Sequence, residues 1–178
     1  TITGFSTGIK MTNTDLEVYN NTVTDCKIGL VLETIRNSKA YGNIIKSTRE
    51  SSDGIVSHPT VEYMDNIIIG SGLNEANTEN KMNIIEVTRT PLKFVNVNTK
   101  SGQENYNLII KNNKINSTNT STISNTYGFE FLDNTITQGG VRLENAKDGT
   151  LKNNTITSTI SHGIRLDKGC SNINISDH

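Results

Sequence analysis

The chain has 178 residues, a formal net charge of -1 and 33% hydrophobic residues. This length fits one domain, and the near-neutral charge excludes the broad basic field with which proteins hold nucleic acid. No apolar run approaches the roughly 20 residues that cross a bilayer, so we expect no membrane insertion. Asparagine, threonine and isoleucine are abundant, with 25, 24 and 22 copies. Isoleucine and threonine favour strands and asparagine favours turns, which predicts an all-β chain.

A glycine followed by alternating apolar residues first appears at Gly8 and recurs along the chain. The five copies begin at Gly8, Gly29, Gly54, Gly140 and Gly163. Alternation of apolar and polar residues predicts short strands that bury one face and leave the other in water.

A second marker, the triplet of asparagine, any residue and an apolar residue, runs in phase with these glycines. The triplets begin at Asn21, Asn43, Asn66, Asn113, Asn134 and Asn154, with gaps of 22, 23, 47, 21 and 20 residues. A fixed period of this length indicates a stacked repeat, and 47 residues are close to two periods. Asn83-Ile84-Ile85 is a candidate for the missing marker. The pattern predicts a parallel β-helix, or solenoid, of about eight coils.

In such a solenoid, equivalent residues of successive coils stack about 4.8 Å apart. One predicted core file contains Ile45, Ile68, Ile115, Ile136 and Ile156. A second contains Ile9, Leu30, Ile55, Val141 and Ile164. We expect the triplet asparagines to turn the chain at a corner, where their amides bond to neighbouring coils as an internal ladder. Phe129 and Phe131 share one face of a strand, and we expect them in the core rather than on a sugar-stacking platform.

The Asn-x-Ile and Gly-Ile-x-Leu markers resemble the repeats of the pectate-lyase-like superfamily, which includes polysaccharide lyases, glycoside hydrolases and phage tailspikes. The resemblance implies a single-stranded right-handed parallel β-helix and an interaction with an acidic or cell-surface glycan. It implies a location outside the cell or on a virion surface. No local catalytic signature of an individual enzyme family stands out, so the resemblance carries over no catalytic residue. A polysaccharide lyase or glycoside hydrolase is the expectation if the chain is an enzyme.

The outward positions of the strands after the marker glycines form two columns of side chains. The first column contains Lys10, Val31, Val56, Arg142 and Arg165. The second contains Thr12, Glu33, His58, Glu144 and Asp167. Because the last two members of each column fall on adjacent coils, we expect a two-by-two cluster of charges.

This cluster is the first candidate site. Neighbouring carboxylates can divide acid and base work, which makes Glu144 and Asp167 catalytic candidates. Arg142 and Arg165 are substrate-binding candidates because guanidinium groups hold anionic sugars by paired hydrogen bonds. Alternating charges are also typical of an ordinary solvated sheet face.

His58 and Glu33 are a second catalytic pair, because a histidine beside a carboxylate can act as a proton shuttle. Pro59 follows His58 and instead suggests an exposed strand end. The chain lacks a phosphate-binding loop, a dinucleotide-binding glycine pattern and a His-Glu-x-x-His motif, so we expect no cofactor and no metal.

Ile44 and Ile67 occupy the middle of two successive triplets, where side chains should point outward. An exposed file of isoleucines indicates one of two arrangements. It is either a partner interface, which predicts a homo-oligomer such as a trimer, or a surface covered by the polar insertion Ser71 to Lys81. Cys26 and Cys170 fall near opposite ends of the rod, so we expect two free thiols.

Two functions remain open at this stage. The first is a carbohydrate-interacting β-helix with a polysaccharide partner, for example part of a tailspike-like depolymerase. The second is a non-enzymatic structural or adhesive rod. The chain opens within a repeat and shows no polar cap at either end, so we expect a single domain, 1–178, that is a fragment of a longer protein.

Overall fold

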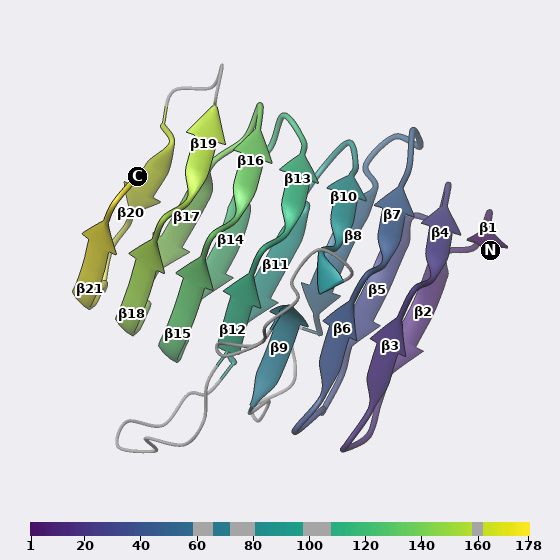
Figure 1. Cartoon of the computed structure of the whole chain (residues 1–178), viewed down its shortest axis with the longest axis horizontal. Coiled ribbons are helices and arrows are strands. Elements are labelled where there is room, and N and C mark those ends of the chain that lie inside the picture. The colour runs from purple at the N-terminus through teal and green to yellow at the C-terminus, as the bar shows by residue number, and fades with distance from the viewer. Residues whose placement is uncertain (59–65, 72–80, 98–107, 158–161) are drawn as a thin grey trace.

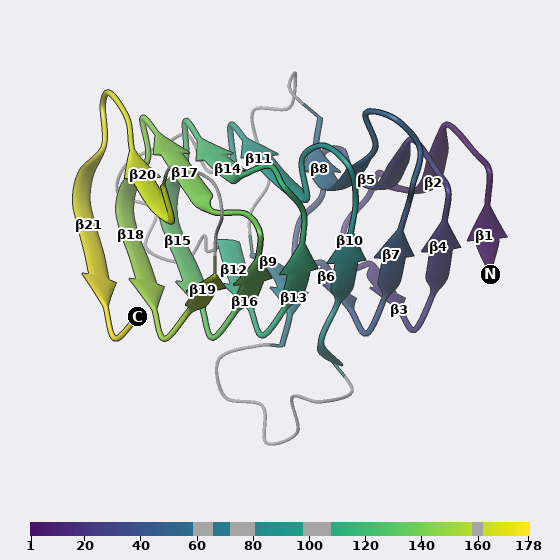
Figure 2. The same cartoon turned by 90° about the horizontal axis from the view of Figure 1, so that it is seen from above.

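A computed structural model describes residues 1–58, 66–71, 81–97, 108–157 and 162–178 of the chain. These residues form an all-β parallel solenoid of about 7 coils, close to the predicted eight. Three parallel sheets of seven strands each run along the rod (Figure 1). The second sheet lies behind the first and third sheets in Figure 1, and Figure 2 shows the rod from above.

The three sheets take one strand each from successive coils. The first sheet contains β1 (Ile2–Thr3), β4 (Thr22–Thr24), β7 (Ile44–Lys46), β10 (Ile84–Glu86), β13 (Lys114–Asn116), β16 (Thr135–Thr137) and β19 (Thr155–Thr157). The second contains β2 (Thr7–Met11), β5 (Ile28–Leu32), β8 (Asp53–Ser57), β11 (Leu92–Val95), β14 (Ser121–Ser124), β17 (Val141–Glu144) and β20 (Ile164–Leu166). The third contains β3 (Glu17–Tyr19), β6 (Lys39–Tyr41), β9 (Ile67–Gly70), β12 (Leu108–Lys111), β15 (Tyr127–Leu132), β18 (Lys147–Lys152) and β21 (Ser171–Ser176).

The two predicted core files are present, with one change of membership. The first-sheet file contains Val23, Ile45, Ile85, Ile115, Ile136 and Ile156 in register. Ile85 therefore takes the place predicted for Ile68. The second-sheet file contains the predicted residues, and Leu92 and Ser121 fill the coils between Ile55 and Val141.

At two of the marker glycines, Gly29 and Gly54, the corner that enters the second sheet is tightly packed against this core. A Cβ atom on Gly54 would lie 2.6 Å from Cγ2 of Ile85, and one on Gly29 would overlap Cγ2 of Ile45. A side chain at either position would displace the core file. The requirement is not the same at every coil, because Pro91 stands at the position equivalent to Gly54.

Two of the largest buried side chains come from the third sheet. Phe129 and Phe131 of β15 are buried, which confirms the prediction that they face the core. Phe129 is paired with Gly149 of β18, and the absence of a side chain at Gly149 leaves room for the ring. A large and a small residue on adjacent coils thus fit together in the core.

A ladder of asparagines at the corner between the third and first sheets ties the coils together. Its members are Asn21, Asn43, Asn83, Asn113, Asn134 and Asn154. Oδ1 of Asn134, for example, accepts bonds of 3.0 Å from the backbone N–H and from Nδ2 of Asn113. Nδ2 of Asn113 also donates to the carbonyl of Ile69 at 2.9 Å. The predicted amide ladder is confirmed, except for the position of one member.

The left-handed turn at this corner is made by the residue that precedes five of the six ladder asparagines. Asn20, Gly42, Asn112, Asp133 and Asn153 have positive φ angles, whereas the ladder asparagines do not. Asparagine, aspartate and glycine are the residues that most readily adopt this conformation. The corner therefore needs two residues, one to turn the backbone and one to bond the coils.

The prediction that Asn66 joins the ladder is wrong, because Asn83 fills that place. Asn66 has a φ of 49° and precedes β9 in the third sheet, where its Nδ2 donates to Oδ1 of Asn37 at 3.0 Å. It belongs to a column of left-handed residues that begins the third-sheet strands: Asp15, Asn37, Asn66, Gly128, Asp148 and Asn172. Its triplet resembles the marker because an apolar strand also follows this corner.

The predicted Ile44 and Ile67 face is also wrong. Ile67 is 1% exposed and lies in the core, whereas the outward neighbour of Ile44 in the first sheet is Ile84. Both Ile44 and Ile84 are half-buried. Of the insertion Ser71 to Lys81 proposed to cover this face, residues 72–80 lie outside the described residues. Homo-oligomerisation stays a prediction, and the register places Ile44 and Ile84 side by side on the outer face of the first sheet.

Cys26 and Cys170 are both free, as predicted, with Cys26 buried and Cys170 partly exposed. In the described part of the chain, no helix is long and apolar enough to cross a membrane.

Candidate functional site

The predicted two-by-two charge cluster is present on the outer face of the second sheet. β17 and β20 are adjacent and in register, which places Arg142 beside Arg165. Asp167 follows β20 and accepts hydrogen bonds from Nε of Arg142 at 2.5 Å and from Nε of Arg165 at 2.6 Å. Glu144 lies 3.4 Å from Nη2 of Arg142. Each carboxylate is thus paired with an arginine, and Asp167 is paired with two.

These contacts determine the protonation state of Asp167. The Arg142 guanidinium, and then that of Arg165, hold the pKa of the Asp167 carboxyl below its ordinary value. Asp167 is therefore ionised at neutral pH and has no proton to give as a general acid. It is well placed to orient both guanidinium groups. Its predicted catalytic role is not tested by this geometry, but such a role would have to be that of a base.

We expect a carbon-13 NMR titration to place the midpoint of the Asp167 carboxyl below the roughly 3.9 of an unperturbed aspartate. Arg142→Leu should raise that midpoint because it removes the largest stabilising contact of the carboxylate. Because the folded-state pKa is depressed, the contribution of this pair to stability is present above pH of about 4 and is lost at lower pH. Lys114→Leu, on the first sheet, is the control that should leave the midpoint unchanged. An unchanged midpoint in Arg142→Leu would contradict the assigned contact.

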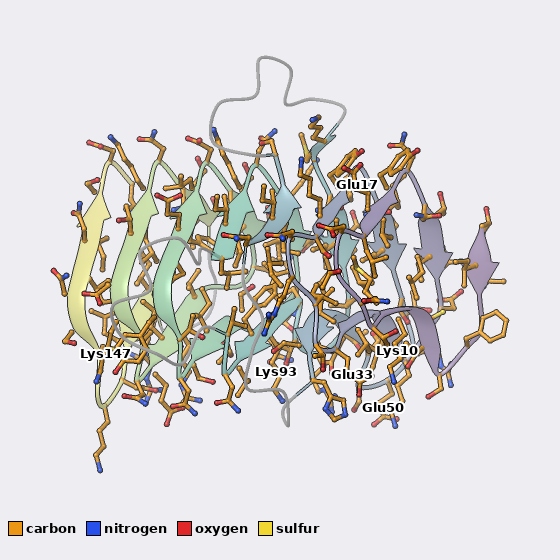
Figure 3. All side chains as sticks on the ribbon, turned by 90° about the horizontal axis from the view of Figure 1, so that it is seen from below. Lys10, Glu17, Glu33, Glu50, Lys93 and Lys147 are labelled. Carbon is orange, nitrogen blue, oxygen red and sulfur yellow. The ribbon has the colours of Figure 1, made fainter. Side chains whose placement is uncertain are left out.

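The second predicted pair, Glu33 and His58, lies nearer the N-terminal end of the same face. Nζ of Lys10 pairs with Glu33 at 2.6 Å, and Figure 3 shows these two side chains on the same side of the rod. The Lys10 ammonium holds the pKa of Glu33 below its ordinary value, and the neighbouring His58 acts in the same direction. His58 is half-buried on the adjacent coil and bonds through its backbone N–H to the carbonyl of Leu32.

The fold does not bring the two predicted pairs together. In the second sheet, β5 and β20 are separated by β8, β11, β14 and β17. Five strand spacings correspond to about 24 Å between Glu33 and Asp167 along the rod. No single sugar ring could contact both pairs, so each has to be judged as a separate site.

A polar hollow of about 330 Å³ borders the charge cluster at the corner between the second and third sheets. It is lined by Ser124, Asn125, Glu144, Asn145, Lys168 and Gly169. The amides of this corner form a second, exposed ladder, in which Nδ2 of Asn145 donates to Oδ1 of Asn125 at 2.8 Å. Glu144 belongs both to this hollow and to the charge cluster.

The sequence analysis missed Asn125, Asn145 and Lys168 as site residues. The two asparagines have φ angles of 48° and 47°, which only Gly, Asn and Asp adopt readily. The 20-residue spacing between them is the same as that between Asn134 and Asn154, which was the signal available in the sequence. Lys168 is exposed, and its ammonium forms no ion pair with a residue in the described ranges.

The third sheet carries two further features that its sequence did not indicate. The rings of Tyr19 and Tyr41 stack with centroids 5.2 Å apart, and the Tyr41 hydroxyl donates to Glu17 at 2.9 Å. Burial raises the pKa of Glu130 on β15. Its Oε2 atom is buried and has no hydrogen-bond partner among the described residues. Neither feature adjoins the charge cluster.

No group of three or more His, Cys, Asp and Glu side chains that could hold a metal occurs in the ranges that the structure describes. Comparison of the chain with protein-family models, curated proteins and solved structures found no match. The predicted parallel β-solenoid is therefore confirmed, whereas membership of the pectate-lyase-like superfamily is not shown.

Proposed function

We propose that this β-solenoid is a glycan-binding protein, and that it holds an acidic polysaccharide along the corner between the second and third sheets. The observation that carries the proposal is the polar hollow at Asn125 and Asn145 beside the Arg142 and Arg165 cluster. Asparagine amides and the Glu144 carboxylate can bond adjacent sugar hydroxyls, because each offers two polar atoms at a fixed spacing.

Charge favours an acidic sugar over a neutral one at this place. Arg142, Arg165 and Lys168 supply three positive charges, and Glu144 and Asp167 supply two negative charges, which leaves one positive charge. Arg165 contacts Asp167 through Nε, which leaves its two terminal nitrogens to meet an anion. Asp167 fixes both guanidinium groups before a ligand arrives, and such preorganisation reduces the entropy lost on binding.

The geometry favours binding over cleavage. Retaining and inverting glycosidases need one protonated carboxyl beside an ionised one. Here Asp167 is kept ionised by Arg142 and Arg165, and Glu144 is paired with Arg142. The resemblance to polysaccharide lyases and tailspikes remains part of this proposal. So does a location outside the cell or on a virion surface, where the chain would meet acidic polysaccharides.

We expect calorimetric titration to detect binding of at least one of polygalacturonate, alginate and hyaluronan, with dextran as the neutral comparison. Binding should weaken as salt rises, because exposed charges are screened. Arg165→Gln combined with Lys168→Gln should weaken it at least tenfold, as expected for the loss of two charge-assisted bonds at about 1.4 kcal/mol per factor of ten. Lys114→Gln, an exposed lysine of the first sheet, should leave affinity unchanged.

The same mixtures distinguish the alternatives. New reducing ends or unsaturated uronates would show cleavage, and Glu144→Gln and Asp167→Asn should then each reduce turnover at least tenfold. Failure of all three acidic polysaccharides to bind would overturn the proposal. That result would favour a structural or adhesive rod. The pairing of the charges within the cluster also supports that function.

A further inference from the structure

A second hollow among the described residues lies on a different edge of the rod, where the first sheet turns into the second. It has a volume of about 480 Å³. Its lining residues lie where β7, β10, β13 and β16 end, and Figure 1 shows these strand ends along the upper edge of the rod. Register places equivalent residues of these four strands side by side. The hollow is therefore a groove parallel to the rod axis that crosses three strand spacings, or about 14 Å. We call it the upper groove.

The floor of the upper groove is held by internal hydrogen bonds. Ser47, Val87 and Ser117 are buried there. The Ser117 hydroxyl donates to the carbonyl of Arg89 at 2.9 Å, and Ser47 Oγ accepts a bond from the backbone N–H of Arg49. The shape of the groove is thus set by the fold rather than by mobile side chains, which favours binding without reorganisation.

The rim of the groove offers neutral hydrogen-bonding groups. Asn116, Thr118 and Gln138 are exposed, and their side chains form no hydrogen bond with another described residue. The two charged rim residues, Lys46 and Glu86, are 3.4 Å apart and neutralise each other. The groove therefore presents free amide and hydroxyl groups and no net charge, in contrast to the hollow beside Glu144.

We propose that the upper groove is a second binding site, and that its ligand is a neutral oligosaccharide lying parallel to the rod axis. An uncharged, elongated chain of hydroxyl groups matches the neutral donors and acceptors that two successive coils present at Asn116, Thr118 and Gln138. Nucleic acid is disfavoured because the groove lacks the positive charge that phosphate binding requires.

An extended peptide is also disfavoured, because it would gain its affinity by adding a strand to an open sheet edge. The strands that form the upper groove are already paired on both sides. The groove offers side chains but no unpaired main-chain edge. This second site goes beyond the acidic-glycan site, and neither depends on the other.

The test is titration of the nitrogen-15-labelled chain with maltohexaose, cellohexaose, xylohexaose, mannohexaose and chitohexaose. We expect at least one of them to shift the side-chain amide signals of Asn116 and Gln138. Asn116→Ala combined with Thr118→Val should weaken that sugar about tenfold, because two neutral hydrogen bonds are lost. Asn174→Ala, an exposed asparagine of the third sheet, is the matched control and should have no effect.

Two results would overturn this inference. One is that none of the five sugars shifts the Asn116 and Gln138 signals; the other is that the double variant binds as the unaltered chain does. Arg165→Gln combined with Lys168→Gln should leave neutral-sugar binding unchanged, so loss of acidic-glycan binding and loss of neutral-sugar binding can be told apart.

Discussion

Asn113→Asp should destabilise the fold by about 3 kcal/mol or more at neutral pH, the cost of a buried donor lost and a charge left unpaired. Asn113 is 1% exposed, and its Nδ2 donates to the carbonyl of Ile69 and to Oδ1 of Asn134. The substitution replaces that donor with an oxygen, which would face two acceptors. Urea unfolding followed by circular dichroism measures the loss.

The loss should be smaller at pH 4 than at pH 7. A carboxyl at this position is easier to protonate in the folded than in the unfolded chain, so its folded-state pKa is raised. The penalty is therefore complete above that pKa and declines as the pH falls through it. Asn116→Asp, three residues later on the exposed side of β13, makes the same chemical change. It should change stability by less than about 0.5 kcal/mol. Equal losses in the two variants would mean that the ladder does not stabilise the solenoid.

Gly149→Ala should also be strongly destabilising, by about 2 to 3 kcal/mol, because it overfills a packed core. A Cβ atom at this position would lie 2.8 Å from Cε2 of Phe129 and closer still to two other ring atoms. The ring is 1% exposed and cannot move toward solvent. Thermal and urea unfolding of the variant provide the measurement.

The matched control is Gly163→Ala, where the nearest atom to the added Cβ would be Cγ2 of Ile156 at 3.7 Å. That is ordinary van der Waals contact, and we expect little loss. Phe129→Leu should partly rescue Gly149→Ala, because the smaller side chain vacates the space. A double-mutant cycle without such coupling would show that the clash is relieved elsewhere.

The fold was predictable because most coils repeat two requirements. One is a glycine where no Cβ fits beside the first-sheet core, as at Gly54 and Ile85. The other is an asparagine whose amide meets its counterpart one coil later, as at Asn113 and Asn134. Each requirement places one residue type at a regular period along the sequence, so the sequence alone indicates the solenoid.

The candidate site was predictable only in part. Alternation placed Arg142, Glu144, Arg165 and Asp167 on one face, and the register confirms that placement. The sequence pattern does not show which atoms meet. The Asp167 carboxylate accepts hydrogen bonds from both arginines, and these bonds keep it ionised. Lys168 and the exposed amides of Asn125 and Asn145 join the site only because the corner folds them toward Glu144.

By itself, the sequence determined the repeat, the core-facing alternation and the glycine and asparagine corners, since each of these leaves a residue type at a regular spacing along the chain. Only the tertiary structure decided that Asn83 rather than Asn66 completes the ladder, and that Ile67 is buried. The physical reason is that both asparagines precede apolar strands, and the choice between two similar corners depends on which amide meets Asn43 and Asn113 across the coils. Contacts between coils set the register, and a local pattern does not contain them.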